Sequence, residues 1–263
     1  MRINYERFFL WFNKLIFSIF YLRHQGKSVA EIKVDSGARF KVRVNTPDAL
    51  MIWEVWKAKV YDDARIPICA EDVVVDMGAH IGAFAVRAAR LAHRGQVFAY
   101  EASSKNYALL MENRELNGLK NLVIENSAVS NKRGKLPLYV PADNSILGSL
   151  MQETSSFVEM VQSTTFSDLI AEHAIQQIDF LKMDVEGAEF DILFGCSDDT
   201  FSKIRRMVIE YHEFENTKHS HRDLVNLLNL HGFKVVVEKA KFPQPGWFGT
   251  GITRIGIIKV WRE

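Results

Sequence analysis

The sequence predicts an α/β fold: a doubly wound, seven-stranded, mostly parallel sheet with an antiparallel carboxyl-terminal edge. From residue 73 onward, short apolar segments rich in β-branched residues alternate with amphipathic helical segments, the pattern of a parallel sheet covered on both faces. The last two apolar segments follow one another without a helix, so they should pair antiparallel. Among the 263 residues, 48% are hydrophobic and 25% charged, which is typical of a globular chain.

The amino terminus is expected to form an amphipathic helix. Residues 8–22 (FFLWFNKLIFSIFYL) are apolar and aromatic, and helical spacing places Arg7, Lys14 and Ser18 on one face. The run is short and interrupted, whereas a spanning helix needs roughly 20 apolar residues. Three roles remain open for residues 5–24: packing on the protein's own core, pairing with a second copy in a homodimer, or peripheral contact with a membrane.

A β-hairpin and a helix should follow. Two segments alternate in polarity around a Ser-Gly turn, at residues 29–34 and 39–44. Residues 48–60 (DALMIWEVWKAKV) have helical periodicity, and Asp48 after Pro47 is the expected N-cap. The chain divides accordingly into an amino-terminal helix and hairpin and a main domain, residues 1–47 and 48–263.

The main domain should contain all seven strands of the sheet. They are expected at residues 73–76, 96–101, 122–125, 178–183, 206–211, 233–238 and 252–260. The helices that accompany them are expected at residues 83–91, 105–117, 167–172, 189–194 and 221–231. Residues 141–156 lack periodicity and are interpreted as either a substrate lid or a plain surface connection.

Charge and cysteine content exclude several classes of protein. With 33 Lys and Arg against 32 Asp and Glu, the net charge of +1 gives no general attraction to nucleic acid, so no nucleic-acid partner is expected. Cys69 and Cys196 lie far apart and have no metal-ligand spacing. We interpret them as small, reduced core residues of a cytoplasmic protein.

A strand, a glycine turn, a helix and a second strand ending in an acid predict a nucleoside site between residues 73 and 101. Gly78 and Gly82 allow a tight turn and close approach of a ligand, and Glu101 can accept hydrogen bonds from ribose hydroxyls. The turn reads GAHIG, not the dinucleotide fingerprint GxGxxG. Asp76 would repel a pyrophosphate but suits the ammonium and sulfonium charges of S-adenosylmethionine.

Three segments of the chain resemble the FkbM-family methyltransferases. They are VVVDMGAHIGAFAV at 73–86, IDFLKMDVEGAEFDIL at 178–193 and RRMVIEYHEF at 205–214. KMDVEGAE, at residues 182–189, is the most specific part, and the resemblance extends over about residues 70–260. It implies the Rossmann-like class I methyltransferase fold and S-adenosylmethionine as cofactor. At position 80 this chain has His where the family more often has Asn.

The resemblance also implies which residues form the cofactor pocket. Asp76, Gly78, Ala79 and Gly82 would lie on the methionine side, and Glu101 would hold the ribose. Ser127 and Ala128 would lie against the adenine, and Asp184 would face the methionine part or the acceptor. The cofactor-binding set is therefore Asp76, Gly78, Ala79, Gly82, Glu101, Ala102, Ser127, Ala128 and Asp184.

Methyl transfer requires positioning of the acceptor and removal of its proton. Glu210 and His212 share a face if their strand continues, and His has an ordinary pKa of about 6.5. Asp184 and Glu186, at the end of the neighbouring strand, could orient that His or the acceptor. These four groups, which are the catalytic candidates, could also ligate a divalent cation. No metal is expected, because carboxylate clusters are common without one.

Two other acids follow Gly187 in the expected helix. Glu189 and Asp191 lie in its first turns, where carboxylates favour the helix dipole whatever the function. We interpret both in that way. Three aromatic residues before the first βα unit are interpreted as core packing or as a roof over the cofactor cleft: Trp53, Trp56 and Tyr61.

The sequence as a whole predicts an S-adenosylmethionine-dependent O-methyltransferase. The expected acceptor is a hydroxyl of a small molecule, either a sugar or glycan or a secondary metabolite, and the expected location is the cytoplasm, with or without peripheral membrane contact. Three alternatives stay open: a non-catalytic member of the fold, an N-methylating member, and a nicotinamide-dependent oxidoreductase. The missing dinucleotide fingerprint argues against the last of these.

Overall fold

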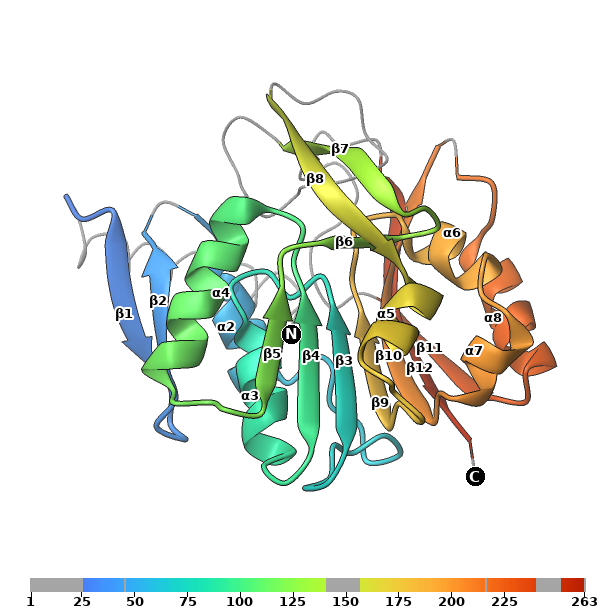
Figure 1. Cartoon of the computed structure of the whole chain (residues 1–263), viewed down its shortest axis with the longest axis horizontal. Helices are drawn as coiled ribbons and strands as arrows, with labels where there is room; N and C mark the ends of the chain where they lie inside the picture. Colours follow the sequence, from blue (N-terminus) through green and yellow to red (C-terminus); the bar gives the residue numbers. More distant parts are fainter. Residues whose placement is uncertain (1–25, 45, 141–156, 216, 240–251, 263) are drawn as a thin grey trace, which may run out of the picture.

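The fold is built around one seven-stranded sheet (Figure 1). A computed structural model describes residues 26–44, 46–140, 157–215, 217–239 and 252–262. The strand order is β11-β12-β10-β9-β3-β4-β5. The bounds are Val73–Met77 (β3), Gln96–Tyr100 (β4), Leu122–Glu125 (β5), Phe180–Met183 (β9), Arg206–Phe214 (β10), Lys234–Lys239 (β11) and Ile252–Trp261 (β12). All seven predicted strands are confirmed.

The pairing of the strands also follows the prediction. β3, β4, β5, β9 and β10 are parallel to their neighbours in that group, and β12 runs antiparallel to both β10 and β11. β11 and β12 therefore form the antiparallel edge that the sequence predicts. The sheet brings the carboxyl ends of β3, β4, β9 and β10 to one edge, where ligands bind in doubly wound folds.

Helices cover both faces of the sheet. One face packs on α3 (Ala83–Leu91) and α4 (Ser104–Leu116), and the other packs on the four helices α5 (Phe166–Glu172), α6 (Glu189–Phe194), α7 (Asp198–Ser202) and α8 (His221–Leu230). Val74 and Val75 are both fully buried, but they belong to different apolar clusters. Successive side chains of a strand point to opposite faces, so both faces of β3 are buried, as in a doubly wound sheet.

The predicted hairpin is present and packs against α4. β1 (Val29–Lys33) and β2 (Arg39–Arg43) pair antiparallel, and the Asn113 side chain of α4 accepts a hydrogen bond from the Lys41 backbone at 2.7 Å. Phe40 shares an apolar cluster with residues of the main sheet. The hairpin and the main domain thus bury a common core, while the division at residue 47 stays a prediction.

The helix after the hairpin differs in two ways from the prediction. It consists of α2 (Asp48–Trp53) and a π-helical turn, η1 (Glu54–Ala58), and its N-cap is Pro47 instead of Asp48. The prediction of an Asp48 cap was wrong because its carboxylate has a stronger partner. Asp48 is fully buried and receives two hydrogen bonds, both at 2.8 Å, from the Arg43 guanidinium.

A second, three-stranded sheet was not predicted. It has the order β6-β8-β7 and consists of β6 (Ala128–Ser130), β7 (Gly134–Val140) and β8 (Phe157–Thr165). In Figure 1 it lies above the carboxyl ends of β4 and β5. β6 is too short to show a periodicity, and Pro137 lies inside β7, which argues against a strand in a sequence. The short helix α7 was missed as well.

The interpretation of the two cysteines as reduced core residues is confirmed in part. Both are free thiols, but Cys69 is exposed, so its placement in the core was wrong, whereas Cys196 is partly buried and packs against an apolar cluster. The Arg206 guanidinium donates to Cys69 Sγ at 3.8 Å, and Cys196 Sγ donates to the Ile192 carbonyl at 3.2 Å.

Two predicted segments lie outside the described residues: the amino-terminal helix, with its membrane or dimer contact through residues 5–24, and the loop at 141–156. In the described part of the chain, every helix is too short or too polar to cross a bilayer.

We expect burial in α8 to set the stability contribution of its leucines. Leu228 is fully buried and Leu230 is 85% exposed, so Leu228→Ala should lower the free energy of unfolding by about 2–5 kcal/mol. Leu230→Ala, the matched control in the same helix, should change it by less than about 0.5 kcal/mol. Urea unfolding followed by circular dichroism measures both. Equal losses would contradict the packing of α8 on the sheet.

Candidate active site

A pocket that is open to solvent lies at the carboxyl ends of the parallel strands, where ligands bind in doubly wound folds. Apolar walls combine with a few polar groups in its lining. The lining residues are Met51, Gly78, His80, Tyr100, Glu101, Ala102, Ser103, Asn106, Ser127, Ala128, Val129, Leu138, Asp184, Val185 and Glu186.

The structure places most of the predicted cofactor residues in this lining: Gly78, Glu101, Ala102, Ser127, Ala128 and Asp184. Asp76, Ala79 and Gly82, which were also predicted, are not among the lining residues, and Asp76 is fully buried. Leu138 reaches the pocket from β7 and Met51 from α2, and neither was predicted.

The turn after β3 lies tightly against the end of β9. Gly78 has a φ of +80°, and a Cβ atom at this position would overlap the backbone carbonyl of Asp184. The amides of Gly78 and Ala79 both donate to the Tyr100 carbonyl, at 3.0 and 2.9 Å. Only glycine satisfies both the positive φ and the close approach, so Gly78 fixes the distance between the cofactor turn and Asp184.

Glu101 is a buried carboxylate held at the pocket wall by three donors. Its Oε2 accepts from the His80 amide at 2.7 Å, and its Oε1 accepts from the Ser103 amide at 2.9 Å and from Asn106 Nδ2 at 3.3 Å. Burial raises the pKa of Glu101, and these hydrogen bonds oppose that shift. The result is a fixed acceptor that can receive ribose hydroxyls.

Lys182 connects the cofactor turn to the acceptor side of the site. It is 4% exposed, and its ammonium donates to the Gly78 carbonyl at 2.8 Å. The ammonium lies 3.4 Å from Asp76 and 3.3 Å from Asp184. Burial lowers the pKa of Lys182, but the neighbouring carboxylates outweigh burial and raise it overall, which favours the cationic form of Lys182.

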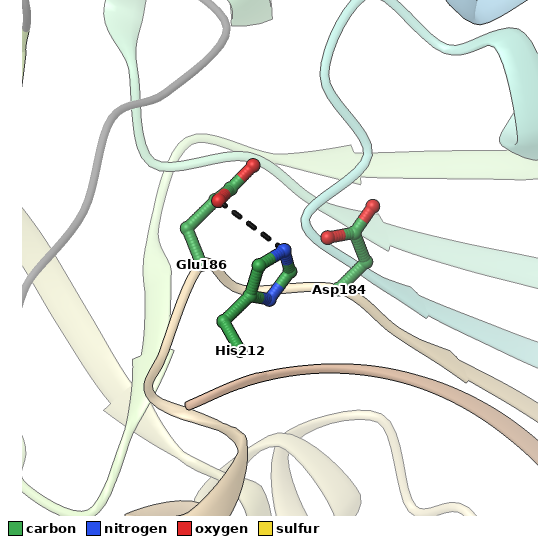
Figure 2. Close-up of side chains that lie close together, drawn as sticks. All are labelled: Asp184, Glu186 and His212. Carbon is green, nitrogen blue, oxygen red and sulfur yellow. Dashed lines mark ion pairs between the residues drawn. The ribbon is translucent and has the colours of Figure 1, made fainter. Parts of the chain in front are cut away.

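The structure brings the predicted catalytic residues together. Figure 2 shows Asp184, Glu186 and His212 side by side, and His212 Nε2 lies 3.5 Å from Glu186 Oε2. Glu210 joins them through Tyr61, whose hydroxyl donates to Glu210 Oε2 at 2.8 Å and lies 3.3 Å from Asp184 Oδ2. β10 continues to Phe214, which meets the condition for Glu210 and His212 to share a face.

Glu189 belongs to this cluster, although the sequence offered only a helix-dipole interpretation for it. Its side chain is fully buried, and Oε1 lies 3.1 Å from His212 Nδ1. The carboxylate also accepts from the amides of Val185 and Gly187 at 3.0 Å. The dipole interpretation was therefore incomplete, since Glu189 orders both the loop after β9 and the imidazole of His212.

The sequence predicted Tyr61 only as a core residue or as part of a roof over the cofactor cleft. It is buried and contacts two carboxylates of the cluster. No pattern in the sequence could have assigned this contact, because Tyr61 follows η1 and lies far from Asp184 and Glu210 along the chain. For Glu189, the signal in the sequence that could have assigned it to the cluster was its position three residues after Glu186 within DVEGAE.

The cluster has more carboxylates than cations. Burial, together with neighbouring acids, raises the pKa of Glu186 to about 8 and that of Glu210 to about 7, although His212 opposes both shifts. Burial lowers the pKa of His212, but Glu186 and Glu189 outweigh it and raise that pKa well above 6.5. The site therefore holds protons that an exposed set of the same groups would release.

The same cluster offers ligand atoms for a metal. One atom each from Asp184, Glu186 and His212 lies within 4.8 Å of the others. Oxygen and nitrogen donors of this kind suit a divalent cation. The expectation that the enzyme works without a metal stays a prediction.

Together, the doubly wound sheet, the strand-end pocket and the buried ribose-type carboxylate are those of a nucleoside-binding α/β enzyme. The family model described as "Methyltransferase FkbM domain" matches residues 76–235, more than half of the chain. The protein belongs to the FkbM methyltransferase family.

Individual relatives have low sequence identity over long alignments. The chain is 26% identical to "31-O-demethyl-FK506 methyltransferase FkbM" of Streptomyces tacrolimicus, over 86% of this chain and 96% of that protein. It is 25% identical to "Methyltransferase 1" of Beauveria bassiana, over 73% of this chain and 83% of that protein. The solved structure of M. jannaschii TYW2 in complex with AdoMet matches 90% of this chain and 88% of its own, with 20% identity and a TM-score of 0.45.

The cofactor of the family is S-adenosylmethionine, and the pocket fits it. Glu101 is a buried acceptor at the pocket wall that would suit the ribose, and Leu138 and Ala128 are lining residues that would offer an apolar surface to the adenine. His80 Nδ1 is buried and has no hydrogen-bond partner among the described residues. Asp184 places negative charge where the cationic methionine part would lie.

Gly78→Ala should disrupt the protein more than the same substitution at another glycine that also has a positive φ. Gly118 has a φ of +63° and open space around it, so Gly118→Ala should cost about 1–2 kcal/mol. Gly78→Ala adds the overlap with the Asp184 carbonyl and should cost about 3 kcal/mol or more. It should also abolish binding of S-adenosylhomocysteine, measured by calorimetry. Equal losses of stability would contradict the close approach of the turn to β9.

Glu186→Gln should change how stability depends on pH. The native protein holds the Glu186 proton up to about pH 8, whereas the unfolded chain releases it near 4.5. This contribution is fully present below the unfolded pKa and is lost as pH rises toward 8. The stability of the unaltered protein relative to Glu186→Gln should therefore fall by about 1–3 kcal/mol between about pH 5 and pH 8.

Urea unfolding at several pH values measures this difference, and the exposed Glu115→Gln is the control. A constant difference between the unaltered protein and Glu186→Gln across that range would show that burial does not raise the pKa of Glu186.

Proposed function

We propose that the protein transfers the methyl group of S-adenosylmethionine to a hydroxyl oxygen of a sugar, a glycan or a secondary metabolite. The observation that carries this proposal is the placement of His212. Its Nδ1 is held by the buried carboxylate of Glu189, and its Nε2 points toward Glu186 at the edge of the cofactor pocket. This is an oriented base beside a cofactor site.

Methyl transfer from a sulfonium to a hydroxyl requires a base, which this chain must supply. The cofactor provides a methyl group on a sulfonium, and the group that leaves is a neutral thioether, so the leaving group needs no acid. A hydroxyl acceptor must lose its proton as it attacks, and a positioned base accelerates such a step about 10²- to 10⁴-fold. The remaining work is alignment of acceptor and donor, which the rigid ends of β9 and β10 support.

His212 can take that proton at Nε2. With Nδ1–H directed at Glu189, Nε2 presents its lone pair toward the pocket side, next to Glu186. The pair of His212 and Glu186 must first lack one proton. Because neighbouring carboxylates raise the pKa of both groups, a neutral to alkaline solution favours the active form.

The charge of the site favours a neutral acceptor. Asp184, Glu186 and Glu210 surround the position of the base, and once Glu186 and Glu210 have released their protons Lys182 neutralises only part of the charge of the three. A phosphate or carboxylate of an acceptor would be repelled there, whereas the hydroxyl of a sugar or metabolite would not. The name of the Streptomyces relative refers to an O-demethyl substrate, which agrees with an oxygen acceptor.

Incubation of the purified protein with methyl-labelled S-adenosylmethionine and fractionated extracts tests the proposal. The label should enter a small molecule or glycan as a methyl ether, which resists alkali, unlike a methyl ester. His212→Asn should lower the rate about 10²- to 10⁴-fold, since it removes the base. His93→Asn, at an exposed histidine outside the pocket, should not change it. Label on an amine nitrogen, or full activity of His212→Asn, would contradict the proposal.

A further inference from the structure

The three-stranded sheet has one face that is open to solvent along β7 and β8. These two strands pair antiparallel, and one of their faces carries the buried side chains of Leu138 and Val161. Side chains alternate along a strand and directly paired residues share a face, so the register defines the opposite, open face. The side chains on this open face are Lys135, Pro137, Tyr139, Val158, Met160 and Gln162. Figure 1 shows β7 and β8 at the top of the view, projecting beyond the main sheet.

Val158 and Met160 give the open face an exposed apolar centre. Val158 is 46% exposed and Met160 is 60% exposed. They pair across the strands with Tyr139 and Pro137, which are half-buried. Single exposed apolar side chains are common on protein surfaces, whereas neighbouring ones that form a patch indicate an interaction surface.

A basic turn borders this apolar centre. Lys132 and Arg133 lie in the turn between β6 and β7, and Lys135 lies at the start of β7. All three are exposed. Glu159 of β8 does not offset their charge on the open face, because it points to the other face and accepts from the Ser104 amide at 3.1 Å.

Two buried serines fix the backbone of the basic turn. Ser130 and Ser163 are 5% and 6% exposed, and their Oγ atoms lie 2.8 Å apart. The Lys132 amide donates to Ser130 Oγ at 3.1 Å, and the Lys132 carbonyl accepts from Ser163 Oγ. The turn is therefore held through its main chain, and its basic side chains stay in solvent.

The combination of cations and exposed apolar side chains indicates the chemistry of the partner. Each Lys or Arg close to an anionic membrane strengthens binding about fivefold, and long basic side chains place their charge in water while their stems contact apolar groups. Tyrosine is enriched at membrane–water interfaces. A nucleic acid would use the cations but not the apolar centre, and Lys is depleted at protein–protein interfaces. A bilayer with anionic lipids uses both features.

We propose that the open face of β7 and β8, together with the basic turn, docks on the anionic surface of a membrane. Val158 and Met160 enter the boundary between headgroups and acyl chains, while the three basic side chains contact lipid phosphates. The sequence left peripheral membrane contact open for residues 5–24, which lie outside the described residues. The open face is a separate surface, and the proposal does not depend on the cofactor or the acceptor.

The open face lies one layer of strands away from the cofactor pocket. Leu138, on the opposite face of β7, is a lining residue of that pocket. A membrane docked on the open face is therefore close to the site.

Co-sedimentation of the full chain with vesicles tests the proposal. The protein should bind vesicles made of equal parts of phosphatidylcholine and phosphatidylglycerol. It should bind vesicles of pure phosphatidylcholine about tenfold more weakly or less, since three cations then lose their partners. Added salt should weaken binding to the mixed vesicles, because it screens exposed charges. Equal binding to both kinds of vesicle would overturn the proposal.

Removal of the three cations tests the electrostatic part. Lys132→Gln, Arg133→Gln and Lys135→Gln, combined in one variant, should weaken binding to the mixed vesicles about tenfold or more. A control variant removes the same charge from exposed positions elsewhere. Its substitutions are Lys33→Gln, Lys120→Gln and Lys218→Gln. The control should weaken binding about twofold or less, since these charges lie away from the docked surface. Equal losses in the two variants would overturn docking through this face.

The double variant Val158→Thr, Met160→Thr tests the apolar part. Threonine suits a strand and removes most of the apolar contact, so binding should weaken about three- to tenfold. Val237→Thr is the matched control, because Val237 is 43% exposed in β11, and it should leave binding unchanged. Full binding by the double variant would overturn the proposal, because charge alone would then hold the protein on the vesicle.

Two further measurements exclude other causes of a loss. Urea unfolding should give similar stability for all variants, since the altered side chains are exposed or half-buried. Sedimentation velocity without vesicles should give the same species for the unaltered protein and the double variant. A species that disappears in the double variant would identify a second copy of the chain as the occupant of the face and overturn membrane docking. Failure of the unaltered protein to bind either kind of vesicle would overturn it as well.

Discussion

The arrangement of the site depends on one buried cation. Lys182 is held among Asp76, Asp184 and the Gly78 carbonyl, and it joins the ends of β3 and β9 at the point where they must stay close. Without it, two carboxylates would face one another with little access to water, and repulsion in a weakly screening interior is strong. Because Gly78 has no Cβ atom, the turn after β3 can approach β9 closely enough for the Lys182 ammonium to reach all three oxygens.

Lys182 alone cannot neutralise all the carboxylates of the site. The excess of carboxylates over cations determines the chemistry of the cluster. Glu186 and Glu210 hold protons at pH values where exposed acids would have lost them, and His212 takes a proton between Glu186 and Glu189. A cationic methyl donor entering the pocket would be attracted by the ionised Asp184, and by Glu186 and Glu210 once they have released their protons, whereas an anionic ligand would be repelled. The same excess of carboxylates thus favours the cofactor and prepares a proton acceptor beside it.

The sequence predicted the main sheet well because each of its strands is a short apolar run, and it predicted the cofactor side because strand, turn, helix and acid follow one another closely in the chain. It did not predict features that depend on packing between segments far apart in the chain. Tyr61 contacts Asp184 only after folding, and Asp48 binds the Arg43 guanidinium instead of capping the helix. β7 was missed because it contains a proline, which is unusual in a strand. Glu189 was visible as an acid, but its contact with His212 depends on how α6 approaches β10.

The segments before the family region explain how a common scaffold can be adjusted in one member. The family match begins at Asp76, yet Met51 lines the pocket, Tyr61 bonds to the catalytic candidates, and Arg43 organises the groups around Glu101. The sheet fixes where strand ends and their carboxylates lie, since its geometry is rigid. Side chains that approach from the hairpin and from the segment around α2 make hydrogen bonds to the groups at those ends. Differences among relatives in cofactor contacts are therefore expected to arise in residues 29–61 as much as in the motifs of the sheet.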